Sequence, residues 1–319
     1  RAAILEAAAQ WAPEEFSEGQ LEKIIRWCLD QHHLRSDGLG MSGEERPVID
    51  REDDTIVLRL HQLMRGRIGF KRNQPLSYSH IMVDEAQDMS PLELAVLFGT
   101  TNRDQSVTLA GDVAQSVAKH RDMTRWVDVL EALSLEHVEV SPLQVSYRST
   151  QSIMKCANDI LGDLAPDQAP ETTRDGAPVG HLRFTSMGQA VAWLSDALSD
   201  LVKREPSAYI ALLTLDQTDA VSWYQALERA EVPNVDLVAD QDFSFSPGVE
   251  VTDIRSSKGL EFDYVILLDV NADRFGTDTG SRTLLHVGAT RAAHQLWMIS
   301  TSTPSPLIPA DLPGLEGGP

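Results

Sequence analysis

Short runs of apolar residues alternate along most of the chain with segments whose apolar residues recur at helical spacing. The runs predict buried strands near 80–84, 107–110, 137–141, 181–185, 208–214, 249–254 and 264–269. Helical spacing predicts helices over 91–99, 123–133, 149–162, 187–203, 217–230 and 282–293. Strands that alternate with helices are typical of crossover units, so the pattern predicts an α/β fold with parallel sheets.

The order of these segments predicts two parallel-sheet domains, the first of them incomplete. The expected break lies near Ser141-Pro142, which gives a partial first domain over 76–140 and a second domain over 141–302. Residues 303–319 are rich in Pro and Gly and are expected to form a flexible tail.

The first 75 residues have a different pattern. It predicts helices at about 1–10, 18–34 and 52–66 with no strand between them. Two interpretations stay open for the segment 1–75: a helical subdomain or insertion that serves a partner, or a plain helical layer that covers the sheet.

Two carboxylates follow directly on the first buried run. Ile81-Met82-Val83 leads into Asp84 and Glu85, and the carboxyl ends of parallel strands are where such sheets bind ligands. One acid can hold Mg²⁺ while its neighbour orients and deprotonates a water. A solvated loop with a helix cap explains the same acids about equally well when they are considered alone.

Further polar motifs follow in a fixed order, and most stand beside a predicted strand or helix. Gly111-Asp112 with Gln115 follows the second strand, and Tyr147-Arg148 precedes a helix. Later motifs add Lys258, the helix-breaking Gly259, Glu261, and Arg291 late in a helical segment. For one isolated arginine a surface salt bridge is the commoner explanation; the ordered set favours a phosphate site.

The whole set resembles the ATPase core of superfamily 1 helicases of the UvrD/Rep type, from motif II to motif VI over roughly residues 78 to 300. The resemblance implies two RecA-like domains of the P-loop NTPase fold that use ATP and Mg²⁺. It implies that Asp84 ligates Mg²⁺ and that Glu85 is the catalytic base. It also implies nucleotide roles for Gln115 (γ-phosphate sensor), Tyr147 (adenine stacking), Arg148 and Arg291 (γ-phosphate contacts), and Glu261 and Gly259 (near the nucleotide).

No Gly-x-x-x-x-Gly-Lys-Ser/Thr motif occurs in the 319 residues. Such a loop supplies the backbone amides and the lysine that surround nucleotide phosphates. We therefore expect the isolated chain not to hydrolyse ATP, and we interpret it as the C-terminal part of a longer ATP hydrolase.

Several positions depart from the DNA-translocating members that the chain resembles. Ala118 and His120 stand where those helicases have base-stacking aromatics, and each lost stack costs about 1–3 kcal/mol per base. His286 replaces a tyrosine and Arg255 a histidine, and the 104 positions from Tyr147 to Val251 leave no room for a large inserted subdomain. These departures resemble the HelD branch, whose members bind RNA polymerase and use ATP to help release it from nucleic acid.

Charge points in the same direction. The chain has 27 basic and 48 acidic residues, a formal net charge of −21, which weakens nucleic-acid binding without abolishing a local basic groove. Three hypotheses stay open: a HelD-type factor that remodels RNA polymerase, a UvrD/Rep-type DNA helicase in repair, and a non-hydrolysing binding module. Only Cys28 and Cys156 occur, and no apolar run is long enough for a membrane span, so a cytoplasmic protein is expected.

Overall fold

The computed structural model describes residues 53–71, 74–103, 105–112, 126–143, 145–165, 171–239 and 241–316. The contacts divide the chain into two compact units: unit 1 is residues 1–78 and 95–100, and unit 2 is residues 79–94 and 101–319. The expected break near Ser141-Pro142 is not where these units part, and it stays a prediction. The helices expected at 1–10 and 18–34 lie outside the described residues.

Unit 1 contains α3 (Asp54–Arg65), the strands β1 (Gly69–Lys71) and β2 (Gln74–Pro75), and the end of α4 (Pro91–Phe98), whose first turn lies in unit 2. The helix expected at 52–66 is confirmed as α3. After this helix, β1 and β2 pair as an antiparallel hairpin that the sequence pattern did not reveal. Strands this short carry too few residues for a visible alternation of apolar and polar positions.

A glutamine ties α3 to the end of α4 within unit 1. Gln62 Nε2 donates to the carbonyl oxygen of Val96 at 2.8 Å. A Cβ at Gly99 would lie 2.3 Å from Gln62 Nε2, so a side chain at position 99 would displace the Gln62 amide. The polar contact therefore fixes the end of α4 against α3.

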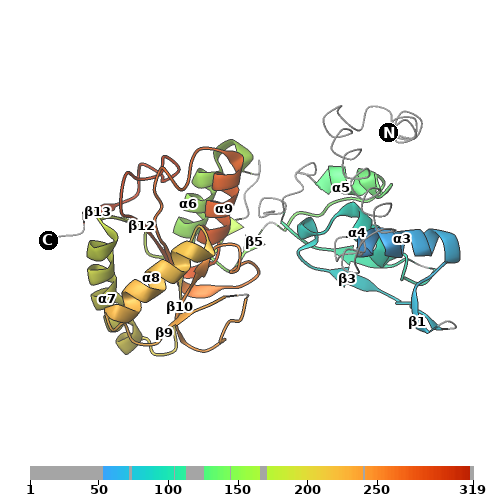
Figure 1. Ribbon diagram of the computed structural model, residues 1–319. Coiled ribbons are helices and arrows are strands. Elements are labelled where there is room, and N and C mark those ends of the chain that lie inside the picture. Colours follow the sequence, from blue (N-terminus) through green and yellow to red (C-terminus); the bar gives the residue numbers. More distant parts are fainter. Residues whose placement is uncertain are drawn as a thin grey trace, which may run out of the picture. The chain divides into compact units, whose positions relative to one another are not determined.

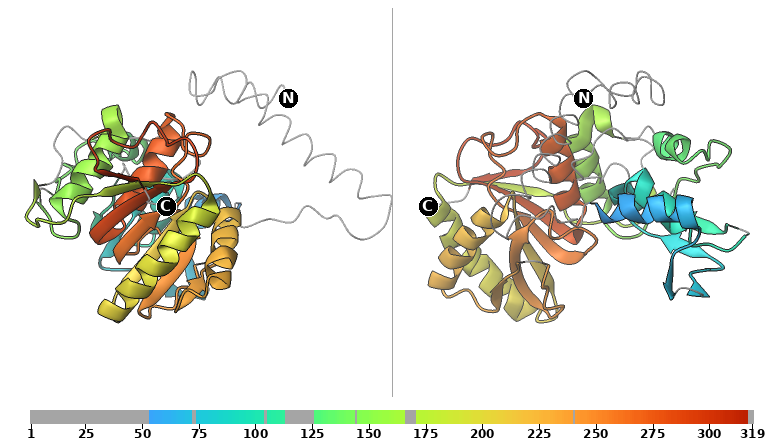
Figure 2. Two further views of the ribbon diagram at one scale, coloured as in Figure 1. Left: turned by 90° about the vertical axis from the view of Figure 1, so that its left-hand side faces the viewer. Right: turned by 45° about the vertical axis from the view of Figure 1, so that its right-hand side comes forward.

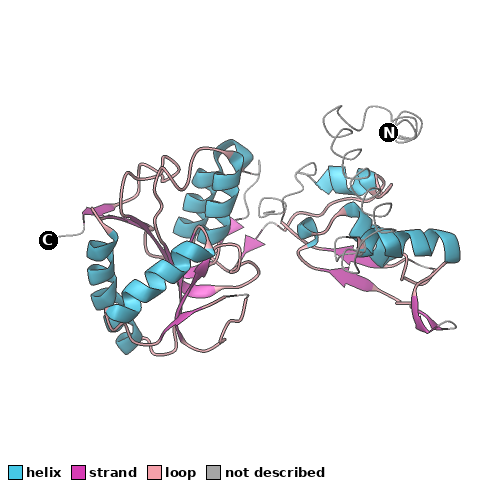
Figure 3. Cartoon of the chain, in the orientation of Figure 1, coloured by secondary structure: helices cyan, strands magenta, loops and turns pink. Residues whose placement is uncertain are grey.

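Unit 2 is built on a seven-stranded parallel sheet (Figures 1 and 3). Its order is β13-β7-β12-β11-β8-β10-β9, with every neighbouring pair parallel. The strands are β7 (Gly180–Arg183), β8 (Tyr209–Thr214), β9 (Val235–Leu237), β10 (Gly248–Asp253), β11 (Phe262–Leu267), β12 (Ala292–Ser300) and β13 (Gly314–Glu316). The predicted α/β class with a parallel sheet is confirmed.

Helices cover both faces of this sheet (Figure 2). One face packs on α6 (Gln151–Leu161) and α9 (Thr279–Ala289), with Ile153, Ile160 and Leu285 in one buried cluster. The other face packs on α7 (Met187–Arg204) and α8 (Gln217–Arg229), with Leu194 and Trp223 in a second cluster. Because both faces are covered, the central strands are continuously apolar, which is why the sequence reveals them.

Side-chain caps fix where three of these helices begin. Ser186, Asp216 and Asp278 each accept a hydrogen bond from the backbone N–H three residues later, at the starts of α7, α8 and α9. Each cap satisfies one of the four backbone donors that have no partner within the helix.

Shorter elements complete the described part of unit 2. The strands β3 (Ile81–Val83) and β4 (Val107–Leu109) form one parallel pair, and β5 (Val145–Ser146) and β6 (Glu171–Thr172) form another. The short helices are η1 (Ala86–Asp88), α5 (Trp126–Ala132) and η3 (Gly162–Leu164).

Two predicted elements are corrected. Residues 137–141 form no strand, and Val138 and Val140 are exposed. The helix expected over 282–293 runs instead from Thr279 to Ala289, and Ala292 begins β12. Nearly continuous apolar residues cross this boundary, so periodicity alone does not separate the helix from the strand that follows.

The segment expected to be a flexible tail is ordered up to Glu316, so that expectation is wrong there. β13 adds to the sheet edge beside β7, and Ser305 and Leu307 are buried. Lys155 Nζ also holds Asp311 at 2.8 Å. Tertiary packing therefore overrides the Pro- and Gly-rich composition. No described helix is long and apolar enough to cross a membrane.

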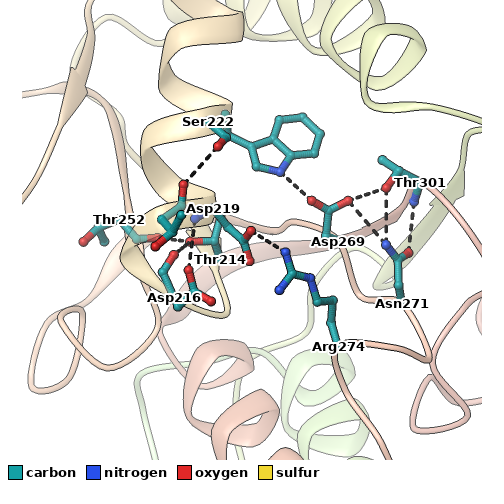
Figure 4. A network of polar contacts seen from close by, with 11 residues as sticks. Thr214, Asp216, Asp219, Ser222, Thr252, Asp269, Asn271, Arg274 and Thr301 are labelled. Carbon is teal, nitrogen blue, oxygen red and sulfur yellow. Dashed lines mark hydrogen bonds and ion pairs between the residues drawn. The ribbon is translucent and has the colours of Figure 1, made fainter.

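A polar network lies where β8, β11 and β12 end (Figure 4). Trp223 Nε1 donates to Asp269 Oδ2 at 2.7 Å, and Thr301 donates to the other oxygen of that carboxylate. Arg274 forms an ion pair with Asp219 at 2.5 Å. These contacts connect α8 to the loops after β11 and β12, and they account for the left-handed backbone of Asp269 (φ 51°) as a locally fixed turn.

Candidate functional site

The acidic motif lies directly after β3, as predicted. Asp84 is exposed, and its Oδ1 accepts the backbone N–H of Glu85 at 2.9 Å. Glu85 is half-buried and has a left-handed backbone (φ 51°, ψ 36°), which is uncommon for a residue with a side chain. Such a conformation persists only where the surroundings fix it, so the direction of the Glu85 side chain is set by its neighbours.

Gln87 is the neighbour that holds Glu85. Its Nε2 donates to Glu85 Oε2 at 2.5 Å, and its Oε1 accepts the backbone N–H of Asp112 at 3.0 Å. A Cβ at Gly111 would lie 2.1 Å from Gln87 Oε1, so a side chain at this position would displace the Gln87 amide. One amide therefore connects the motif after β3 to the motif after β4.

A lysine of the later motif approaches the same acidic turn. Lys258 Nζ forms an ion pair with Asp88 Oδ1 at 2.5 Å, and the Lys258 side chain is only 11% exposed. Gly259 follows with a left-handed backbone (φ 80°) and open space around its Cα, so the backbone conformation and not crowding requires glycine.

The Tyr147-Arg148 motif follows β5. The Tyr147 side chain is 73% exposed. Arg148 Nε forms an ion pair with Glu261 Oε1, and both side chains are about half exposed. The structure therefore brings together two residues that the sequence had marked separately, Arg148 and Glu261, and leaves an aromatic ring in the open beside them.

Sequence reasoning missed Arg174. Its Nη1 donates to the carbonyl oxygen of Arg148 at 2.7 Å, and its Nη2 contacts His294 Nδ1 at 2.8 Å. The only available signal was an arginine next to Asp175-Gly176 in a loop, which no pattern distinguishes from an ordinary surface residue.

Arg291 is buried, at 1% exposure. It lies between α9 and β12 and not late in a helix as predicted. Its guanidinium donates to the carbonyl oxygens of Val287 and Leu260, each at 3.1 Å, and to Thr290 Oγ1 at 3.3 Å. The arginine therefore has a structural function in joining the end of α9 to the loop before β11.

Burial lowers the pKa of Arg291 from 12.5 to about 10, and the positive charge of Arg148 acts in the same direction. The negative charges of Glu85, Glu261 and Asp112 raise it. Arg291 keeps its charge at neutral pH. The acids after β3 and β4, the pair Arg148–Glu261 and the buried Arg291 thus lie within electrostatic range of one another.

Other predicted positions differ in surroundings. His286 is buried, and its Nδ1 contacts the carbonyl oxygen of Ala157 at 3.0 Å. Arg255 is exposed in a turn that Asp253 fixes by accepting its backbone N–H at 2.9 Å. Gln115, Ala118 and His120 lie outside the described residues.

The described residues contain no group of three or more His, Cys, Asp or Glu side chains arranged to hold a metal ion. Mg²⁺ usually binds through one or two carboxylates with water and phosphate oxygens as the other ligands. The single exposed carboxylate of Asp84 therefore fits a nucleotide-bound Mg²⁺ and does not fit a metal site made of protein ligands alone.

Two helicase domain families match the chain. The UvrD/REP helicase N-terminal domain matches residues 41–124, and the UvrD-like helicase C-terminal domain matches residues 248–299. Over these residues the chain is similar to both domains of UvrD-like helicases.

The curated relatives of this UvrD-like chain have helicase names. A probable DNA helicase of Mycoplasma pneumoniae is 25% identical over 79% of the chain and 49% of its own length. DNA helicase IV of Escherichia coli is 25% identical over 72% of the chain and 35% of its own length. The UvrD-like chain thus spans half or less of these relatives.

Among solved structures, the C-terminal domain of a possible DNA helicase from Lactobacillus plantarum is similar to this UvrD-like chain. The two are 26% identical, with a TM-score of 0.43, over 51% of this chain and 92% of that domain.

Proposed function

We propose that this chain is the part without the phosphate loop of the ATP-hydrolysing core of a UvrD-like motor that acts on single-stranded nucleic acid. The observation that supports it best is the convergence of Glu85, Arg148, Glu261 and Arg291, whose charges act on one another although they come from distant motifs.

Each group has a proposed role. Glu85, held by Gln87, would accept the proton of the attacking water. Tyr147 would stack on the base, and Arg148 and Arg291 would stabilise negative charge on the γ-phosphate, an effect worth about 10³–10⁵ in rate for such arginines. Mg²⁺, held by Asp84, would supply charge neutralisation at the phosphates. Gln115, Gly259 and Glu261 remain proposed nucleotide contacts.

Glu85→Gln in the complete protein tests the proposal. The amide keeps the size of the side chain and removes the base, so ATP turnover should fall at least about a hundredfold while ATP binding stays. Glu136→Gln, at an exposed position, is the matched control. Turnover that survives in the Glu85 variant would refute the role of the base.

A second candidate is the HelD-type function, in which RNA polymerase is the partner. The net charge of −21 favours it, because such a field opposes binding to polyanions. ATP turnover of the complete protein should be measured with single-stranded DNA and with RNA polymerase in separate titrations. Stimulation by DNA alone would support the helicase proposal; stimulation by polymerase alone would support the HelD-type function.

A non-hydrolysing binding module remains the third hypothesis. The same measurement decides it, since a binding module would bind ATP and show no turnover with either partner.

A further inference from the structure

The turn that carries Tyr147 and Arg148 is held by the segment that follows α6 and η3. Val145 and Ser146 of β5 pair with Glu171 and Thr172 of β6. The backbone N–H of Gln151 donates to the carbonyl oxygen of Arg174 at 2.9 Å. The chain on both sides of the turn is therefore attached to residues 171–174.

The Arg174 side chain closes the gap between these two attachments. Its Nη1 donates to Arg148 O at 2.7 Å and lies 3.5 Å from Tyr147 O, so the guanidinium contacts two successive carbonyl groups of the turn. A charged donor makes hydrogen bonds about twice as strong as a neutral one. The Arg174 side chain thus adds to the two backbone attachments in fixing the chain direction at Tyr147 and Arg148.

A histidine and an aspartate orient this guanidinium. Arg174 has only donors, so His294 Nδ1 accepts from Nη2 at 2.8 Å and the imidazole proton lies on Nε2. That nitrogen faces Asp263 Oδ1 at 3.3 Å, and Asp263 Oδ2 accepts the backbone N–H of Tyr209 at 2.9 Å. The chain of contacts begins on the central strands β8, β11 and β12 and ends at the turn.

We propose that Arg174 is a positioning residue that sets the Tyr147-Arg148 turn for nucleotide binding, with His294 and Asp263 as its support. The inference rests on the proposed function, because it requires Tyr147 to contact a base. The open Tyr147 ring has few neighbours to fix it, so its place depends on the backbone that Arg174 holds.

The test uses the complete protein and two probes, ATP and inorganic tripolyphosphate, which lacks a base. Arg174→Ala should raise the KM for ATP about tenfold, because the base contact of Tyr147 is lost. Inhibition by tripolyphosphate should stay within about twofold, because the ion pair with Glu261 holds the Arg148 side chain without Arg174. The KM of Arg174→Lys for ATP should lie between that of the wild type and that of Arg174→Ala. An ammonium group lacks the planar fork that reaches the carbonyls and His294 together.

A double-mutant cycle separates positioning from general damage. In a Tyr147→Ala background, Arg174→Ala should change the KM for ATP by less than about twofold, because residues that act as a unit are not additive. Arg183→Ala, at the exposed end of β7, is the matched control and should match the wild type.

The outcomes differ for the two proposals. A wild-type protein without ATP turnover would overturn the proposed function and this inference with it. Normal wild-type turnover would overturn the inference alone if the KM of Arg174→Ala were unchanged, if the effect added to that of Tyr147→Ala, or if tripolyphosphate inhibition weakened equally.

Discussion

Arg291 has two functions in this chain, one structural and one proposed for catalysis, and a methionine substitution separates them. The guanidinium makes two hydrogen bonds to backbone carbonyls, at Val287 and Leu260. Losing two bonds from a charged donor costs about 3–6 kcal/mol. A second effect has the opposite sign. Burial lowers the pKa of Arg291 from 12.5 to about 10, which means that the buried charge destabilises the folded state. Replacing the arginine by a neutral residue removes this cost and raises the free energy of unfolding by about 3 kcal/mol.

The two effects nearly offset each other, so Arg291→Met should lower the free energy of unfolding by only about 1–3 kcal/mol. Arg291→Ala also leaves a cavity and should cost about 2 kcal/mol more. The methionine variant should therefore remain folded, while its ATP turnover in the complete protein should fall at least about a thousandfold if the guanidinium contacts the γ-phosphate.

Urea unfolding followed by tryptophan fluorescence measures the change in stability, since Trp223 and Trp297 both pack in the hydrophobic cluster between the large sheet and α7 and α8. Arg183→Met, at an exposed arginine, controls for loss of charge. If Arg291→Met lost as much stability as Arg291→Ala, the proposed balance between lost hydrogen bonds and the removed buried charge would be refuted. A folded methionine variant with normal turnover would refute the phosphate contact.

Three further predictions concern other groups. Burial lowers the pKa of His181 to about 4, below its unfolded value of 6.5. As pH falls, the unfolded chain therefore binds a proton at His181 before the folded chain does. The contribution of the neutral histidine to the free energy of unfolding is full above pH 6.5 and is reduced by about 2 kcal/mol at pH 5. The free energy of unfolding of His181→Gln should fall less between pH 7 and pH 5 than that of the wild type. An equal fall in the two proteins would contradict the prediction. Gln87→Ala should lower turnover about tenfold by releasing Glu85, with ATP binding kept; an unchanged kcat would contradict the positioning of Glu85. Burial raises the pKa of Cys156 to about 12, so in a Cys28→Ser chain iodoacetamide should label it only after unfolding, and labelling of the folded chain would show that the thiol is accessible.

The strands of the large sheet could be predicted from sequence because they are buried on both faces. Residues 208–214 and 249–254 were expected as strands and correspond to β8 and β10. The edges were harder, since β9 and β13 have three residues each and their pairing depends on distant neighbours. Residues 137–141 have the composition of a strand, but their apolar side chains are exposed in the described structure.

The candidate site also has residues that the sequence revealed and residues that it did not reveal. Residues that would contact a nucleotide stand in motifs of fixed order, so Glu85, Arg148 and Glu261 could be named from sequence. The residues that hold them could not. Arg174 acts through contacts with Arg148, 26 positions away, and with His294, 120 positions away. No local pattern encodes a distance of that kind.

Gln87 shows why this second layer matters for mechanism. It stands inside the acidic motif, yet its role appears only when the ends of β3 and β4 are seen together, because its amide contacts Glu85 and Asp112 at once. The left-handed backbone of Glu85 stores strain that a free loop would release. A base held in this way has one direction in which to accept a proton. Rearrangement after β4 would therefore reach Glu85 through the Gln87 side chain and through the backbone hydrogen bond from Ala86 N–H to the carbonyl oxygen of Ala110 at 2.9 Å.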